Sequence, residues 1–176
     1  MATLETWLKS EETGESFTHC VSCRIPLLET DMSWLVNKDY FRGECVLEYA
    51  LCQGCREELS ARISEASKAA VRQFLESEIA WDQRVAEFMM SDDVLLRFER
   101  CIACRTPRED AEGYGISALF DSGGEVVTGP LPLLICRPCI GRMTASLSEE
   151  SRAIWREFLD RHFDGPPDSG GFPGLF

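Results

Sequence analysis

The stretch FTHCVSCRIP, residues 17–26, recurs as FERCIACRTP, residues 98–107, and both copies read FxxCxxCRxP at an offset of 81 residues. A second match follows: SEASKAAVRQFL, residues 64–75, returns as SEESRAIWREFL, residues 148–159, at an offset of 84. Two matches in the same order predict an internal duplication. We therefore expect two similar units, the second having gained three residues between its matched stretches.

Eight of the nine cysteines form four CxxC pairs, two in each copy. Their spacings are C-x2-C-x28-C-x2-C in the first copy and C-x2-C-x31-C-x2-C in the second. Two such pairs can turn four sulfurs toward one point and complete a tetrahedron around Zn²⁺, with metal–sulfur distances of about 2.3 Å. We predict two Zn²⁺ ions per chain, with these ligands: Cys20, Cys23, Cys52 and Cys55 in the first copy, and Cys101, Cys104, Cys136 and Cys139 in the second.

Two alternatives to this assignment stay open at the level of sequence. A cross-brace arrangement would join the first CxxC pair with the third and the second with the fourth, although a duplicated unit is expected to be self-contained. Iron is also held by two CxxC pairs in rubredoxin-like sites, but we expect zinc because no electron-transfer setting is recognisable. Four thiolates leave no coordination position for water, so the pattern disfavours a hydrolytic zinc.

The order of these motifs resembles zinc ribbons and treble clefs: a CxxC knuckle, a β-hairpin, and then a CxxC that opens a helix. The resemblance is at motif level and covers residues 17–59 and 98–143. It implies that the helix N-terminus beside the second CxxC favours thiolate over thiol. Treble-clef knuckles often have glycine just after the second cysteine, where this chain has Arg24 and Arg105.

Turn signals and alternation predict the strands. In the second copy, strands at 114–120 and 125–128 flank Asp-Ser-Gly-Gly at 121–124, a hairpin signal. In the first copy we expect strands at 34–36 and 45–51 around a less distinct turn.

Helical spacing follows each second CxxC pair. Ser64 and Ser148, each followed by glutamate, are predicted to cap a further helix in each copy. Residues 78–90 have no counterpart in the second copy, and we expect a connecting helix that packs Trp81, Val85, Phe88 and Met89 across both halves. The predicted fold class is therefore α+β, built from two small duplicated zinc-binding modules.

The predicted organisation has five parts. They are an N-terminal segment (1–16), zinc module 1 (17–77), the connecting helix (78–97), zinc module 2 (98–163) and a Gly/Pro-rich tail (164–176).

Composition limits the function classes. The formal net charge of -12 disfavours a general nucleic-acid binder, because phosphate contacts need a basic surface. Neither a signal-like start nor an apolar run of membrane-spanning length is visible, so we expect a cytoplasmic protein without a membrane partner. Nine cysteines in such a protein indicate metal rather than disulfides.

Other conspicuous residues have simpler interpretations. Cys45 aligns with Val126 and is expected to be a small buried strand residue, and His19 is expected to be a solvated neighbour of Cys20. His162 is expected to interact with the C-terminal end of its helix. With two histidines and no Ser/His/Asp setting, we identify no catalytic and no cofactor-binding residues beyond the metal ligands.

The expected function is a non-catalytic, structural-zinc protein that acts as a scaffold for protein binding or regulation. Two alternatives remain. Arg97, Arg100 and Arg108 make the second knuckle basic, as a nucleic-acid-binding zinc protein would require, although the recurring Arg24 and Arg105 are expected only to offset thiolate charge. A thiol-based redox or zinc sensor would release its metal on mild oxidation.

Overall fold

A long β-hairpin begins the central sheet of the computed structural model, which describes residues 3–163. Strands β1 (Trp34–Phe41) and β2 (Glu44–Cys52) are joined by Arg42 and Gly43, whose φ angles are 51° and 83°. Positive φ at both central residues matches a type I′ turn, whose twist suits antiparallel strands. The first-copy strands therefore extend up to this turn, farther than the sequence predicted.

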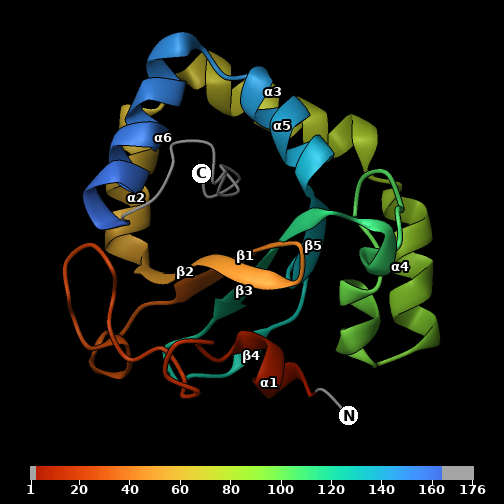
Figure 1. Ribbon diagram of the computed structural model, residues 1–176, viewed down its shortest axis with the longest axis horizontal. Coiled ribbons are helices and arrows are strands. Elements are labelled where there is room, and N and C mark those ends of the chain that lie inside the picture. The colour runs from red at the N-terminus through yellow and green to blue at the C-terminus, as the bar shows by residue number, and fades with distance from the viewer. Residues whose placement is uncertain (1–2, 164–176) are drawn as a thin grey trace.

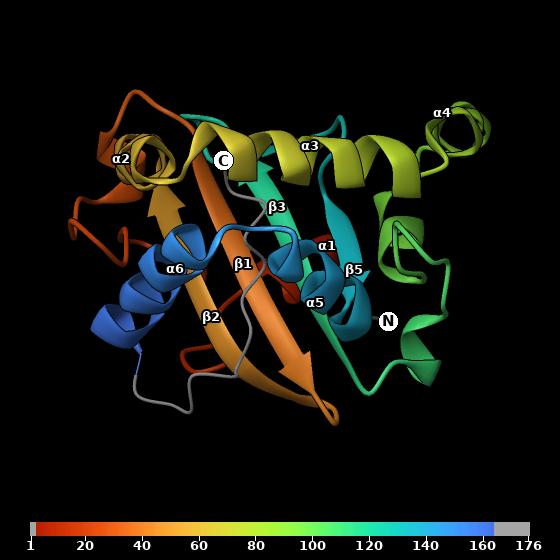
Figure 2. The same ribbon diagram turned by 90° about the horizontal axis from the view of Figure 1, so that it is seen from above.

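The sheet is antiparallel and continues from the first copy into the second. Strand β3 (Gly113–Phe120) pairs with β1 over its whole length, with Asn37 opposite Ser117. Strands β4 (Val126–Val127) and β5 (Leu133–Cys136) share the other edge of β3. Figure 2 shows β5 beside β3, and Figure 1 labels β4. The β3–β4 hairpin was predicted, whereas β5, which pairs with more of β3, was not.

Helices cover one face of the sheet (Figure 1). These are α2 (Gln53–Arg62), α3 (Glu65–Glu78), α5 (Arg137–Ala145) and α6 (Glu149–His162). The short α1 (Leu4–Leu8) lies on the opposite face, and α4 (Trp81–Met90) lies beside the sheet. Three 3-10 turns complete the described part of the chain: η1 (Leu27–Glu29), η2 (Val94–Phe98) and η3 (Arg108–Asp110). The structure is thus α+β, as predicted.

The second helix of each copy packs with the other copy. Val71 of α3 belongs to a core with Cys101, Cys136 and Cys139, and α3 lies beside α5. Trp155 of α6 belongs to a core with strand residues of the first copy, and α6 lies beside α2. Each cysteine cluster is therefore covered partly by a helix from the opposite half of the sequence.

The N-termini of α3 and α6 meet through four serines. Ser64 and Ser148 are the N-caps of these helices, as predicted, and accept hydrogen bonds from the backbone N–H groups of Ser67 and Ser151. The contacts also cross over: the N–H of Ser148 donates to Oγ of Ser67 (2.8 Å), and the N–H of Ser64 donates to Oγ of Ser151 (3.1 Å).

The connecting segment differs from the prediction. Glu78 ends α3 and Trp81 starts α4, so residues 78–90 are not one helix. Val85 and Met89 are 52% and 83% exposed, while Arg84 is buried. Trp81 packs against a core and Phe88 is partly buried. The expected apolar face is therefore formed only in part, because α4 turns Arg84 inward and leaves Val85 and Met89 exposed.

Buried polar groups lie on both faces of the sheet. Lys38 of β1 is fully buried on the α1 side, where Nζ donates to the carbonyls of Trp7 and Lys9 and to the carboxylate of Glu11. Residues 3–16 therefore contribute packing that the sequence did not predict.

The predicted Gly/Pro-rich tail at 164–176 lies outside the described residues. Between residues 3 and 163, helices are too short or too polar to cross a membrane.

Candidate metal centres

The first four-cysteine cluster joins the knuckle to the end of the hairpin. Cys20 and Cys23 lie in the knuckle, Cys52 ends β2, and Cys55 lies in the first turn of α2. The four sulfurs lie within 4.8 Å of one another, and those of Cys23 and Cys52 are 3.7 Å apart. The residues predicted to bind one metal are thus gathered at one point.

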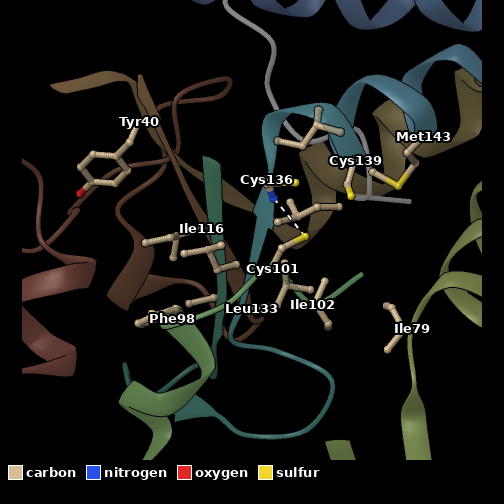
Figure 3. Packing of buried hydrophobic residues seen from close by; sticks show 14 of the residues in the cluster. Tyr40, Ile79, Phe98, Cys101, Ile102, Ile116, Leu133, Cys136, Cys139 and Met143 are labelled. Carbon is tan, nitrogen blue, oxygen red and sulfur yellow. Dashed lines mark hydrogen bonds between the residues drawn. The ribbon is translucent and has the colours of Figure 1, made fainter. Parts of the chain in front are cut away.

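The second cluster repeats this arrangement at the diagonally opposite corner of the sheet. Cys101 and Cys104 lie in the second knuckle, Cys136 ends β5 and Cys139 lies in α5 (Figure 3). Their sulfurs also lie within 4.8 Å of one another, with 3.5 Å between Cys104 and Cys136. Because each cluster draws on one copy only, the cross-brace arrangement is not formed.

The knuckles have the same backbone conformation. The residue after the second cysteine, Arg24 or Arg105, is left-handed, with φ of 64° and 65°. Its N–H donates to the carbonyl of the first knuckle cysteine, Cys20 or Cys101, at 3.0 Å in both copies. Arginine therefore adopts the backbone that glycine usually provides in such turns.

Each knuckle is held against the strand that leads to its partner cysteines. The N–H of Val21 donates to the carbonyl of Ala50 on β2, and that of Ile102 donates to Leu134 on β5. These bonds fix the distance between the two CxxC pairs of each cluster. The predicted hairpin of the second copy did not include β5, so this docking was visible only in the structure.

Backbone N–H groups point at the sulfurs. Cys52 N–H donates to Sγ of Cys20 at 3.4 Å, and Cys136 N–H donates to Sγ of Cys101 at 3.3 Å (Figure 3). Cys52 and Cys136 are also the N-caps of α2 and α5, as the motif resemblance implied. Helix N-termini and N–H donors both stabilise thiolate charge.

One side chain near the second cluster was not identified from sequence. Nη2 of Arg142 lies 3.3 Å from Sγ of Cys139, while Nη1 donates to Glu78 of α3 at 3.1 Å. Arg142 is one turn of α5 beyond Cys139, a spacing that places both on one helix face. The guanidinium therefore offsets sulfur charge and ties α5 to α3.

The thiols of one cluster cannot all ionise without a cation. In the second cluster, burial raises the pKa of Cys101 and of Cys136. Burial also opposes ionisation of Cys104, but hydrogen bonds from Thr106, and then from the thiols of Cys136 and Cys101, outweigh it and lower its pKa to about 6. In the first cluster, burial raises the pKa of Cys52 and Cys55. Burial thus keeps these thiols protonated until a metal cation displaces their protons.

The sulfur positions fit a tetrahedral metal and not cystines. A tetrahedron with metal–sulfur bonds of about 2.3 Å has sulfur–sulfur edges of about 3.8 Å, close to the 3.5 and 3.7 Å found here. A disulfide requires about 2.05 Å. All nine cysteines are free thiols.

The remaining conspicuous residues lie outside the clusters. Cys45 is a half-buried residue of β2, and burial, followed by the charge of Glu48, raises its pKa to about 12. His19 is exposed and its ring contacts Thr18, while His162 packs edge-on against Phe158. Cys45 thus has the strand position that its alignment with Val126 predicted, but it is half-buried and not buried as expected.

Together these features define a protein with two four-cysteine clusters arranged to bind metal. Comparison of the chain with protein-family models, with curated protein sequences and with solved structures gave no match.

Proposed function

We propose that each cluster binds one Zn²⁺ and that the two ions act structurally in a non-catalytic scaffold for binding another protein. The observation that carries this is the grouping of four cysteine sulfurs within 4.8 Å in each copy. A four-thiolate zinc has no open position for substrate or water. Zinc is favoured over iron because cysteine tetrads of this kind are its usual structural site.

The position of the clusters supports a structural role for the metal. Each ion would join a knuckle, the end of an edge strand and the start of a helix. Apparent zinc binding to such sites is worth roughly 10–16 kcal/mol at neutral pH. A half-chain of this size with a modest core has only about 3–5 kcal/mol of its own, so metal would decide whether each half folds.

We interpret the architecture as two duplicated zinc-ribbon or treble-clef-like modules that have fused their sheets. Supporting this, β1 pairs with β3, and the CxxC pairs that follow the edge strands lie at opposite corners. The exchanged packing of α3 and α6 would make the modules mutually dependent. The domain limits inferred from the sequence then describe units of duplication, not independent folding units.

A partner surface is suggested by α4. Val85 and Met89 lie one turn apart and are 52% and 83% exposed, and the neighbouring Met90 is 88% exposed. Exposed apolar side chains of this kind on one helix are typical of protein-binding surfaces. The net charge of -12 favours a basic or uncharged partner.

This function is tested by affinity capture from the native cell with wild type and two matched variants. Val85→Asp/Met89→Asp changes the α4 surface, and Arg156→Asp changes an exposed residue of α6. The scaffold proposal expects a protein retained by wild type and Arg156→Asp but lost from the α4 variant. A purified pair should then bind directly. If nothing is enriched over an unrelated acidic bait, the scaffold proposal is contradicted while the metal assignment stands.

A second candidate, a thiol-based sensor, is favoured by one observation. Each cluster has one exposed cysteine, Cys23 in the first and Cys104 in the second. An exposed thiolate is the one that peroxide reaches first. Zinc release at low peroxide, reversed by thiol reductant, would favour the sensor. Zinc release only under denaturing conditions would favour the scaffold function over the sensor function.

A further inference from the structure

Four arginines meet at a small pocket between α4 and the second knuckle. The pocket has a volume of about 180 Å³, and Arg84, Arg97, Arg100 and Arg105 all line it. Arg84 comes from α4, which is labelled in Figure 1, and Arg97 comes from η2. Arg100 and Arg105 lie at the two ends of the knuckle, so the fold gathers the four arginines from three elements. This gathering stands out in a chain with a net charge of -12.

Most of this positive charge has no carboxylate partner. Arg105 pairs with Glu87 at 2.8 Å. Among residues 3–163, no carboxylate lies within 4.0 Å of the guanidinium nitrogens of Arg84, Arg97 or Arg100. Elsewhere in the protein, arginines such as Arg62 and Arg142 do pair with glutamates. Glu87, Asp93 and Glu99 also line the pocket, so its four arginines and three carboxylates give a formal charge of +1, and three of the four arginines have no carboxylate at ion-pair distance.

Neutral carbonyls hold two of these guanidiniums in place. Nη2 of Arg84 donates to the carbonyls of Pro130 and Pro132, and Nη1 of Arg97 donates to those of Gly129 and Leu131. Both guanidiniums also lie over the ring of Phe88, at 4.8 and 3.6 Å from its centroid. These contacts orient the arginines but neutralise neither, because carbonyls and an aromatic ring carry no net charge.

Arg84 carries the clearest sign of a missing partner. It is only 5% exposed, and its Nε has no hydrogen-bond partner in the described part of the chain. Burial, followed by the nearby charge of Arg97, lowers the pKa of Arg84 to about 10. Holding a buried cation beside a second cation is costly unless an anion offsets both. A neutral hydrogen-bond donor at position 84 would be enough to hold the loop of residues 129–132.

We propose that this pocket binds a phosphate-class dianion. Guanidiniums bind such tetrahedral oxyanions with paired, charge-assisted hydrogen bonds, and three of the four here have no carboxylate at ion-pair distance to compete for those bonds. A volume of 180 Å³ is below the ~300–1,000 Å³ of typical small-molecule sites, which suits a single anionic group rather than a nucleotide. The acidic remainder of the surface disfavours a long polyanion. The inference does not depend on the scaffold function.

The test uses the labelled, metal-loaded full chain in phosphate-free buffer. Inorganic phosphate is titrated in while the arginine Nε–Hε signals are followed by NMR, with sodium chloride of equal ionic strength as the blank. We expect saturable shifts of the Arg84 and Arg97 signals with phosphate but not with chloride. A parallel titration with O-phosphoserine distinguishes the two sources of the phosphate group. Tighter binding of O-phosphoserine than of inorganic phosphate would identify a phosphorylated side chain as the ligand, and weaker binding would identify the free ion.

Matched variants make the proposal falsifiable. Arg100→Gln removes an exposed guanidinium of the pocket and should weaken phosphate binding about tenfold. Glu99→Gln removes a competing carboxylate at the pocket and should tighten it, while Arg156→Gln on α6 should change nothing. All three sites are exposed, and thermal melts check that each variant folds.

Three outcomes overturn the proposal. The first is the lack of any saturable shift in wild type, and the second is equal affinity in the Arg100 and Arg156 variants. The third is a single-stranded oligonucleotide that displaces phosphate and shifts signals well beyond these arginines, which would identify a nucleic-acid surface instead.

Discussion

Arg24 and Arg105 occupy the same place in their knuckles and share a left-handed backbone, with φ of 64° and 65°. For a residue with a Cβ this conformation costs about 1–2 kcal/mol. Both knuckles carry this conformational energy, at the turn that brings the two sulfurs of a CxxC pair to one point. The energy of metal binding is large enough to offset it.

Replacing the strained arginine with glycine should therefore be tolerated. We expect Arg24→Gly to have a free energy of unfolding about 1–2 kcal/mol above that of Arg24→Val, because valine meets the full steric cost and glycine none. Denaturant unfolding of the metal-loaded proteins measures the difference. The order should reverse at Arg156 in the helical α6, where glycine is the poorer residue. Equal values at position 24 would mean that the left-handed turn is not formed.

The serine crossing should couple the two halves energetically. Ser67 and Ser151 are 2% and 1% exposed, and each accepts a hydrogen bond from an N-cap residue of the opposite helix. Ser67→Ala would leave the N–H of Ser148 without this acceptor and should lower the free energy of unfolding by about 0.5–1.5 kcal/mol. Exposed Ser77, which contacts only Phe74 of its own helix, provides the control.

A double-mutant cycle separates coupling from local loss. Ser67→Ala and Ser151→Ala share one network, so their effects should differ from additivity by at least about 0.5 kcal/mol. Strict additivity would show that the helices do not depend on each other at this crossing.

Asp39 should make stability fall as pH rises. Burial raises the pKa of this carboxyl from its ordinary 3.8 to about 8, although the charge of Arg137 opposes the shift. Between these values the unfolded chain has released a proton that the folded chain retains, so the stabilisation present at low pH is lost as pH rises through the window. Asp39→Asn removes this dependence, and its free energy of unfolding should exceed that of wild type by about 2–3 kcal/mol more at pH 8 than at pH 5.5.

Taking the difference between variant and wild type at each pH cancels the pH dependence of metal binding. Asp160→Asn, at an exposed carboxylate of α6, should leave the wild-type profile unchanged. Parallel profiles for Asp39→Asn and wild type would show that this carboxyl titrates normally.

The sequence was sufficient for features that depend on local spacing. The paired cysteines predicted which eight sulfurs meet, because CxxC geometry is set within four residues and the repeated motif indicated which pairs belong together. The N-caps at Ser64 and Ser148 were predicted for the same reason. The helical start at the second CxxC of each copy also followed from the motif.

Features that depend on distant partners were not predictable. Strand β5 was missed because its short apolar run follows a proline-rich loop, while the Asp121–Gly124 turn pointed to the shorter β4. Lys38 is buried only because α1 and Glu11 supply acceptors across the sheet. The inward turn of Arg84 likewise requires the carbonyls of the 129–132 loop.

The most direct test of the central claim is metal content measured together with fold. Protein purified without added metal is examined by elemental analysis and native mass spectrometry, and by circular dichroism before and after chelation. We expect close to two zinc ions per chain, eight cluster thiols that become titratable only after denaturation with chelator, and loss of structure when zinc is removed. A chain that remains folded without metal, contains iron instead, or holds these cysteines as disulfides would contradict the account.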